Sequence, residues 1–148
     1  MGNGKTTLRN MTNEKIYVTL KYTPGTSTWN KKEIKPYDGC TDVYTGMVSK
    51  IQATIEGDHQ TLTTQLKVNT EYAVFRKLNG YAIKECSQIS IENLTPDTLY
   101  VTAMIDTEEP IWESRELGML KAFVLAFPAN THELRLIIEG ANGRTLVI

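Results

Sequence analysis

The chain has 148 residues, of which 41% are hydrophobic, 22% charged and 8% aromatic, and this composition excludes the disordered, collagen-like and membrane-spanning classes. Its 16 basic and 17 acidic side chains give a net charge of −1, so it lacks the basic excess with which nucleic-acid-binding proteins displace counterions. The longest apolar run covers residues 119–128 and is far shorter than the roughly 20 residues of a transmembrane helix.

The N-terminal residues and the two cysteines carry only weak targeting and redox signals. Residues 1–6 lack the apolar region of a secretory signal, which predicts a cytoplasmic protein or one released without a leader. Gly2 with Thr6 fits the minimal myristoylation pattern. Cys40 and Cys86 have neither metal-binding nor Cys-x-x-Cys spacing, which favours two free thiols, with a single disulfide as the alternative.

Alternating apolar and polar residues predict β-strands from the first part of the chain onward. Ile16, Val18 and Leu20 alternate with polar or amphipathic residues, and the same period of two recurs over residues 51–55 and 62–68. The 20 threonines and the abundant Ile, Val and Tyr residues suit the half-buried surface of a pleated sheet. This part of the chain is therefore predicted to consist of strands and turns.

A hairpin is predicted in the middle of the chain. Residues 71–78 and 81–86 are rich in apolar residues, and Asn79-Gly80 lies between them. Both residues of this dipeptide tolerate the positive φ of a type I′ turn, so the pair is a strong hairpin signal. Beyond the hairpin, residues 99–104 and 134–138 alternate like the earlier strands.

The second half of the chain resembles the first. A shift of 83 positions places residues 6–57 on residues 89–140 without a gap, with 10 identities in 52 positions. The identities include Asn-x-Thr at 10–12 and 93–95, Tyr-Val-Thr at 17–19 and 100–102, and Ile-Glu-Gly at 55–57 and 138–140. A tandem duplication explains this match, and chance similarity is the alternative.

The repeat also decides the structure predicted for residues 116–127. Taken alone, the apolar residues of this segment lie roughly on one face of a helix. The matching first-copy residues 33–39 contain Pro36 and Asp38-Gly39, which break helices. We therefore predict strand, turn and strand in both copies, with a helix as the alternative for the second.

About ten short strands with short connections predict an all-β protein, specifically a β-sandwich of antiparallel strands. Repeat 1 covers about residues 5–66, a connecting hairpin covers residues 67–87, and repeat 2 covers about residues 88–148. A copy of about 60 residues cannot cover the apolar face of its own sheet. We therefore predict a single domain over residues 1–148, in which the two copies pack with pseudo-two-fold symmetry.

The sequence contains no recognisable motif for catalysis, metal binding or cofactor binding. His59 and His132 do not match under the repeat, and neither has a metal-binding partner or a serine or cysteine motif nearby. The glycine motifs of dinucleotide-binding proteins and of serine hydrolases do not occur either. The prediction is a protein that is not an enzyme and that binds no metal or cofactor.

The two tryptophans are the first candidates for a binding site. Trp29 and Trp112 match under the repeat, and each follows a polar loop. The polar residues beside them are Asn30, Glu33, Glu113 and Glu116. An aromatic ring beside hydrogen-bonding groups suits a sugar ring or a lipid headgroup. The alternative interpretation is that each indole closes one end of the core.

A second duplicated surface is predicted on the strands that carry Tyr-Val-Thr. Tyr17 and Thr19, and likewise Tyr100 and Thr102, alternate with the apolar residues, so they point away from the predicted core. This face is predicted to be a ligand platform, a dimer contact or plain solvent-exposed surface.

The pattern over residues 8–44 resembles the β-sandwich cytolysins and the fungal fruiting-body lectins. It consists of a strand, an Asn-x-Thr turn, a second strand, and the segment Pro36-Tyr37-Asp38-Gly39 that leads into further strands. The chain departs from the actinoporin-like members because it lacks their dense Tyr and Trp cluster and their amphipathic N-terminal helix. The resemblance implies lectin-like or membrane-active behaviour by analogy of fold.

The leading hypothesis is a non-enzymatic binding module with lectin-like recognition of a carbohydrate or another polar cell-surface ligand. One alternative is a membrane-active β-sandwich of the cytolysin or toxin type. Another is a structural or partner-binding protein that forms homo-oligomers through its sheets.

Overall fold

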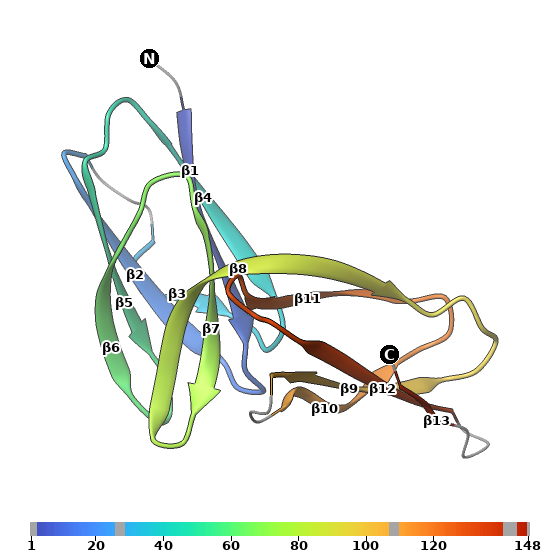
Figure 1. The fold of residues 1–148 in the computed structure, drawn as a ribbon. Helices are drawn as coiled ribbons and strands as arrows, with labels where there is room; N and C mark the ends of the chain where they lie inside the picture. Colours follow the sequence, from blue (N-terminus) through green and yellow to red (C-terminus); the bar gives the residue numbers. More distant parts are fainter. Residues whose placement is uncertain (1–2, 26–28, 107–109, 141–144, 148) are drawn as a thin grey trace. The chain divides into compact units, whose positions relative to one another are not determined.

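The computed structural model describes residues 3–25, 29–106, 110–140 and 145–147 (Figure 1). Within these ranges the chain forms thirteen β-strands and no helix, so the predicted all-β class is confirmed. Accordingly, the described residues include no helix of the length and apolar character that a membrane crossing requires. The chain divides into two compact units, Met1–Glu85 (unit 1) and Cys86–Ile148 (unit 2). The prediction that residues 1–148 behave as one domain stays a prediction.

Unit 1 contains two sheets. Its strands are β1 (Asn3–Met11), β2 (Ile16–Thr23), β3 (Lys32–Ile34), β4 (Gly39–Thr45), β5 (Lys50–Glu56), β6 (Thr61–Leu66) and β7 (Glu71–Lys77), followed by β8 (Gly80–Glu92), which continues into unit 2. One sheet has the order β3-β2-β5-β6, and in the other β4, β1, β7 and the first half of β8 are neighbours. The described chain thus has more strands than the ten predicted, in part because the three-residue β3 is too short to show alternation.

One strand pair of unit 1 contradicts the prediction of purely antiparallel pairing. β1 and β7 run in parallel, with Thr7 opposite Glu71 and Met11 opposite Phe75. Strands joined by a tight turn must be antiparallel, but β1 and β7 are separated by five other strands. The intervening chain is long enough to return β7 to the sheet in the same direction as β1.

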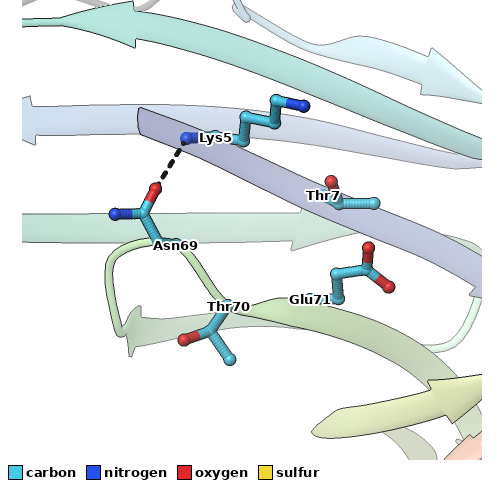
Figure 2. A pocket seen from close by; sticks show the side chains of 5 residues that line it. All are labelled: Lys5, Thr7, Asn69, Thr70 and Glu71. Carbon is cyan, nitrogen blue, oxygen red and sulfur yellow. Dashed lines mark hydrogen bonds between the residues drawn. The ribbon is translucent and has the colours of Figure 1, made fainter. Parts of the chain in front are cut away.

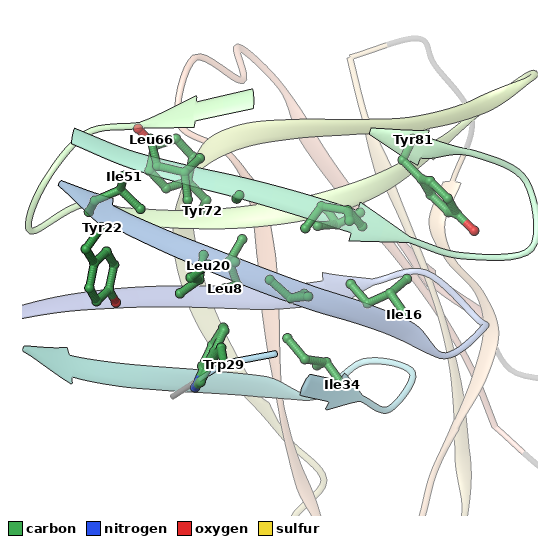
Figure 3. Close-up of a cluster of buried hydrophobic side chains, with 14 of the residues drawn as sticks. Leu8, Ile16, Leu20, Tyr22, Trp29, Ile34, Ile51, Leu66, Tyr72 and Tyr81 are labelled. Carbon is green, nitrogen blue, oxygen red and sulfur yellow. The ribbon is translucent and has the colours of Figure 1, made fainter. Parts of the chain in front are cut away.

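The inward side chains of both sheets in unit 1 form one hydrophobic cluster. Burial alternates along β2, where Ile16, Val18 and Leu20 are buried, as the period of two predicts. The other sheet contributes Leu8 and Tyr72 (Figure 3). Each fully buried Leu or Ile contributes about 1.5–3 kcal/mol through removal of its side chain from water. Packing of the two sheets against each other therefore stabilises this unit.

Unit 2 has a similar set of strands. They are β9 (Leu99–Ile105), β10 (Pro110–Leu117), β11 (Ala122–Pro128), β12 (Leu134–Gly140) and β13 (Thr145–Val147), together with residues 86–92 of β8. The strand order in one sheet is β10-β9-β12-β13, and β11 pairs with β8. The helical alternative for residues 116–127 is wrong, because β10 ends at Leu117 and β11 begins at Ala122. Leu120 adopts a positive φ of 57° in the turn between them.

The predicted hairpin forms, but its turn lies one residue earlier than expected. β7 and β8 pair from Tyr72 opposite Glu85 to Lys77 opposite Gly80, which leaves residues 78–79 as the turn. Gly80 has a different role: a Cβ atom at this position would overlap the side chain of Gln60, which would have to move. The glycine therefore permits a close packing contact and not the expected turn geometry.

The Asn-x-Thr segment at residues 10–12 is a buried hydrogen-bonding centre. The Asn10 Nδ2 group donates to the carbonyl oxygens of Glu14, Ile34 and Lys35, at 2.7, 3.0 and 3.2 Å. The Asn10 Oδ1 atom accepts from the backbone N–H of Thr12 at 3.0 Å and from its hydroxyl at 2.6 Å. One side chain therefore joins the end of β1 to the turn after it and to the end of β3.

The same set of bonds surrounds Asn93 in unit 2. Its Nδ2 group donates to the carbonyl oxygens of Asp97, Leu117 and Gly118, at 2.7, 3.0 and 3.2 Å. Its Oδ1 atom accepts from the N–H and the hydroxyl of Thr95, at 2.9 and 2.6 Å. Each partner lies 83 positions after its counterpart in unit 1. Both asparagines are buried, which assigns these Asn-x-Thr sequences a structural role and makes them poor glycosylation acceptors.

Candidate functional site

The outer face of the sheet β3-β2-β5-β6 brings together two groups of residues that the sequence analysis treated separately. Tyr17 lies on the outer side of β2 and is 39% exposed, as its place in the alternating pattern predicts. It is directly opposite Glu33 on β3 and Glu56 on β5. Residues opposite each other in antiparallel strands have Cβ atoms about 4.5–5.5 Å apart. The tyrosine ring is thus flanked by a carboxylate on each side.

Each of these carboxylates also has a lysine partner. The Lys15 ammonium lies 3.6 Å from Glu33, and the Lys31 ammonium lies 3.9 Å from Glu56. All four side chains are substantially exposed, and such surface ion pairs contribute only about 0–1 kcal/mol to stability. The charged groups are therefore available to a ligand at little cost. We call these five residues the Tyr17 site.

Thr19 positions one of these lysines through the backbone. Its hydroxyl oxygen accepts a hydrogen bond from the N–H of Lys31 at 3.0 Å. Lys31 has a positive φ of 54°, a conformation that a non-glycine residue adopts only where its surroundings hold it. In unit 2 the Thr102 hydroxyl accepts from the N–H of Ser114, also at 3.0 Å, and Ser114 has a φ of 46°. Both predicted threonines therefore have a structural role beside the tyrosines.

Unit 2 carries a corresponding site around Tyr100. This side chain is 40% exposed on β9. It is opposite Glu116 on β10 and Glu139 on β12. The places of Lys15 and Lys31 are taken by Thr98 and Ser114. We call Tyr100, Glu116 and Glu139 the Tyr100 site, which offers carboxylates without the two paired lysines of the Tyr17 site.

The predicted tryptophans are core residues. Trp29 is buried in the hydrophobic cluster of unit 1, and its backbone carbonyl accepts a hydrogen bond from the N–H of Leu20 at 3.1 Å. Trp112 is fully buried in unit 2. Its ring meets that of Phe123 edge-on, and the Arg115 guanidinium lies over both rings. This burial agrees with the alternative that each indole closes part of a core, and contact of either ring with a ligand stays a prediction.

The polar neighbours of the tryptophans have different surroundings. Asn30, Glu33, Glu113 and Glu116 are all exposed. Among them, strand register brings Glu33 to Tyr17 and Glu116 to Tyr100. Glu56 and Glu139 were not among the site residues predicted from the sequence. The Ile-Glu-Gly sequence that both copies share at 55–57 and 138–140 was the signal that could have identified them.

A shallow polar pocket of about 260 Å³ lies elsewhere on unit 1 (Figure 2). It is lined by Lys5, Thr7, Asn69, Thr70 and Glu71. The Asn69 side-chain oxygen accepts a hydrogen bond from the backbone N–H of Lys5 at 3.1 Å, which ties the turn before β7 to β1. The pocket has no aromatic wall on which a sugar ring could stack, so it is a weaker candidate than the two tyrosine sites.

His59 belongs to a hydrogen-bonded cluster that the sequence analysis missed. Its Nε2 atom lies 3.0 Å from Glu14 Oε2, while the Tyr81 hydroxyl donates to Glu14 Oε1. The hydroxyl oxygen of Tyr81 also accepts from the backbone N–H of His59 at 3.3 Å. Burial, reinforced by the bond to the Glu14 carboxylate, raises the pKa of Tyr81. Through these bonds the cluster connects the turn before β6 to the turn after β1 and to β8.

In the described structure, Cys40 of unit 1 and Cys86 of unit 2 form no disulfide. Burial raises the pKa of the Cys40 thiol, opposed by the nearby Lys32 and reinforced by Asp38, so this thiol is a poor nucleophile at neutral pH. Among the described residues, no group of three or more His, Cys, Asp or Glu side chains is arranged to hold a metal ion. That the chain is not an enzyme stays a prediction.

No protein-family model and no curated protein matches the chain. A functional conclusion therefore depends on the chemistry of the sites themselves. The two tyrosine sites share an exposed ring between two cross-strand carboxylates, and they occupy the same place in their two units.

Proposed function

We propose that this protein is a non-enzymatic binding module that recognises a carbohydrate, or a similarly polar cell-surface ligand, through the Tyr17 and Tyr100 sites. The observation that carries the proposal is the exposed tyrosine with one glutamate on each neighbouring strand, present in both units. It replaces the tryptophans as the centre of the site while keeping Glu33 and Glu116 from the sequence prediction.

The chemistry of a sugar ring fits this arrangement. A pyranose has an apolar C–H face that packs on an aromatic ring and hydroxyl groups around its edge. Carboxylates accept hydrogen bonds from these hydroxyls, and such charge-assisted bonds are about twice as strong as neutral ones. In the Tyr17 site, Lys15 and Lys31 add donors for the hydroxyl and ring oxygens. An exposed sheet face also suits a ligand that is itself part of a larger surface.

We further propose that the two units are tandem copies of one β-sandwich unit. The first support is the conserved hydrogen bonding of Asn10 and Asn93, which joins equivalent atoms 83 positions apart. The second is the recurrence of positive φ values at Lys31 and Ser114, and at Tyr37 and Leu120, which obey the same offset. The pseudo-two-fold arrangement of the copies stays a prediction.

Two copies would give two binding sites on one chain. A ligand on the face of a sheet is buried less than a ligand in a cleft, so each site is expected to bind weakly alone. Where a polymeric glycan reaches both sites, the second contact becomes intramolecular and the apparent affinity rises by about 10²–10⁴-fold. A duplicated module is therefore better suited to a dense glycan surface than to a free monosaccharide.

A glycan array is the direct test. The wild-type protein should bind a limited set of glycans, and Tyr17→Ala or Tyr100→Ala should each weaken binding about tenfold, since an aromatic contact contributes about 0.5–1.5 kcal/mol beyond its buried area. The double variant should lose binding. Lys21→Ala is the matched control, because Lys21 is exposed on the same strand as Tyr17. Binding by the double variant at wild-type strength would contradict the proposal.

A parallel assay with dye-loaded liposomes separates this function from the membrane-active alternative. The apolar residues of β2 lie in a strand that is paired on both edges, with β3 and β5, so insertion into a bilayer would break a central strand out of its sheet. The protein should leave liposomes intact at micromolar concentration, whether or not it binds glycans on their surface. Dye release would favour the cytolysin-type alternative instead.

A further inference from the structure

The second half of β8 has one unpaired edge in the described structure. Residues 86–92 pair with β11 along one edge. The strand order β11-β8-β7 places β11 and β7 on opposite edges of β8, and β7 pairs only with residues 80–85. No strand among the described residues therefore pairs with residues 86–92 on the edge opposite β11. An unpaired strand edge presents backbone donors and acceptors to any chain that can extend the sheet.

Unit 1 shows what fills the equivalent edge there. β1 pairs with β4 as β8 pairs with β11, since Leu8 is opposite Cys40 and Ile91, 83 positions later, is opposite Phe123. The other edge of β1 is occupied by β7, which runs parallel to it (Figure 1). In unit 2, no described strand lies beside residues 86–92 of β8 in the way that β7 lies beside β1.

The exposure of apolar side chains follows this difference. Met11, at the end of β1 and opposite Phe75 on β7, is only 2% exposed. Its counterpart Leu94, two residues beyond the end of β8, is 73% exposed. The inward residues of β5 are entirely buried, namely Ile51, Ala53 and Ile55. Their counterparts on β12 are only partly buried, namely Leu134, Leu136 and Ile138. Unit 2 thus has apolar side chains that lack the cover that unit 1 has.

The orientation of the backbone groups along this edge follows from one hydrogen bond. The N–H of Asn93 donates to the carbonyl of Lys121, on the side of β11, at 2.9 Å. Alternate residues of a strand direct their N–H groups to opposite edges. The N–H groups of Ser90 and Glu92 therefore face the unpaired edge. We call residues 88–92 on this side the acceptor edge.

We propose that the acceptor edge binds an extended peptide segment of a partner protein, which adds to β8 as a parallel strand in the way that β7 adds to β1. This function goes beyond sugar binding, because it uses the backbone of β8 and neither tyrosine site. Strand addition of this kind draws its affinity from backbone hydrogen bonds and its specificity from alternate side chains.

The chemistry of the expected segment can be read from β7 and from the charges beside the acceptor edge. Tyr72 and Val74 are the residues of β7 that belong to the hydrophobic cluster of unit 1, although Ala73 and Phe75 between and after them are buried as well. The segment therefore needs large apolar side chains at the two alternate positions that correspond to Tyr72 and Val74. The exposed carboxylates of Glu92 and Asp97 lie along and just beyond the acceptor edge. If the segment pairs with β8 in the register in which β7 pairs with β1, its residues after the one that corresponds to Phe75 lie near these carboxylates. In β7 these residues are Arg76 and Lys77, which are basic. The partner segment should therefore have apolar residues at alternate positions and basic residues at its C-terminal end.

The test uses a labelled synthetic peptide with the sequence of residues 70–78 and the full-length protein, with fluorescence anisotropy as the readout. The peptide should bind saturably, and a scrambled peptide of the same composition should not. A second pair of peptides is N-methylated either at Tyr72 and Val74 or at Ala73 and Phe75. Only one set of N–H groups can face β8 in a strand, so one N-methylated peptide should lose binding and the other should keep it.

Variants of the protein locate the bound strand. Ser90→Pro removes an N–H that faces the acceptor edge and leaves the bonds to β11 in place, so it should weaken peptide binding about tenfold. Ser90→Thr keeps the N–H and is the matched control. If Ser90→Pro fails to fold by circular dichroism, the N-methylated pair still decides the question.

Several results would overturn the proposal. These are no preference for the peptide over its scrambled form, equal binding of the two N-methylated peptides, and unchanged binding by a folded Ser90→Pro variant. A wild-type dimer in sedimentation that Ser90→Pro converts to a monomer would also overturn it, since a second copy would then occupy the edge. Tyr17→Ala and Tyr100→Ala should leave peptide binding unchanged, which separates this test from that of sugar binding.

Discussion

Replacing Asn10 by alanine should destabilise the protein far more than the loss of one small side chain suggests. The side chain is buried and makes five hydrogen bonds. Three of these are fully buried, to the Ile34 carbonyl and to the N–H and hydroxyl of Thr12. Alanine would remove these three bonds in a place that water reaches poorly, although the Thr12 hydroxyl would keep its bond to the Glu14 carbonyl at 3.0 Å. At about 1–1.5 kcal/mol for each, the expected loss is about 3–5 kcal/mol.

The corresponding change at Asn93 should cost less. Its partners Thr95 and Asp97 are exposed, so water can replace part of what the asparagine supplies. Asn10→Asp should be at least as damaging as alanine, because a carboxylate would face carbonyl oxygens where an NH2 group now donates to them. Asn13→Ala, an exposed asparagine in the same turn, is the matched control. Surface substitutions of that kind usually change stability by less than about 0.5 kcal/mol.

Urea unfolding followed by tryptophan fluorescence and circular dichroism measures these differences. Domains of this size have a total stability of about 5–15 kcal/mol, so a loss of 3–5 kcal/mol shifts the midpoint strongly. The order of stabilities should be wild type and Asn13→Ala, then Asn93→Ala, then Asn10→Ala. A loss below about 1 kcal/mol for Asn10→Ala would refute the reasoning, because it would mean that the buried partners find other bonds at no cost.

Three further predictions concern the cores and pH. Trp29→Ala and Trp112→Ala should each cost about 3–5 kcal/mol in the same urea assay, because both rings are buried, and a small loss would restore the case for a ligand contact. The raised pKa of Tyr81 means that the folded protein keeps a proton that the unfolded chain loses. Stability should therefore fall as pH rises above about 10, and Tyr81→Phe, which cannot ionise, should reduce this slope. Calorimetry should give one cooperative transition if residues 1–148 form one domain; two separate transitions would show that units 1 and 2 unfold independently.

Local patterns predicted the strands of this protein well, because alternation is itself a local property. Ile16, Val18 and Leu20 show their period of two within five residues, and they are buried as that period requires. The parallel pairing of β1 with β7 was missed, since nothing in either segment records which strand lies beside it. The structure of residues 116–127 was ambiguous from its own pattern, and comparison with residues 33–39 gave the correct strand and turn.

For the candidate site too, single residues could be predicted from the sequence, but contacts between distant parts of the chain could not. Tyr17 and Glu33 were predicted as site residues for separate reasons, and only strand register shows that they are neighbours. Glu56 was not selected, because its contact depends on the pairing of β2 with β5. The cluster of Glu14, His59 and Tyr81 was missed altogether, since its members lie up to 67 positions apart in the chain.

The two tyrosine sites differ in charge, and this difference predicts which glycans each site prefers. Both sites present carboxylates, which repel an acidic sugar, but in the Tyr17 site Lys15 and Lys31 lie beside them and offset that charge. At the Tyr100 site the equivalent residues are Thr98 and Ser114, which are neutral. Acidic glycans should therefore depend on Tyr17 and be insensitive to Tyr100→Ala, whereas neutral glycans should be weakened by either change. Because screening by salt reduces charge effects between exposed groups, this difference should shrink as ionic strength rises from about 0.01 M to 1 M. Equal dependence of acidic glycans on both tyrosines at low salt would show that the lysines do not take part in recognition.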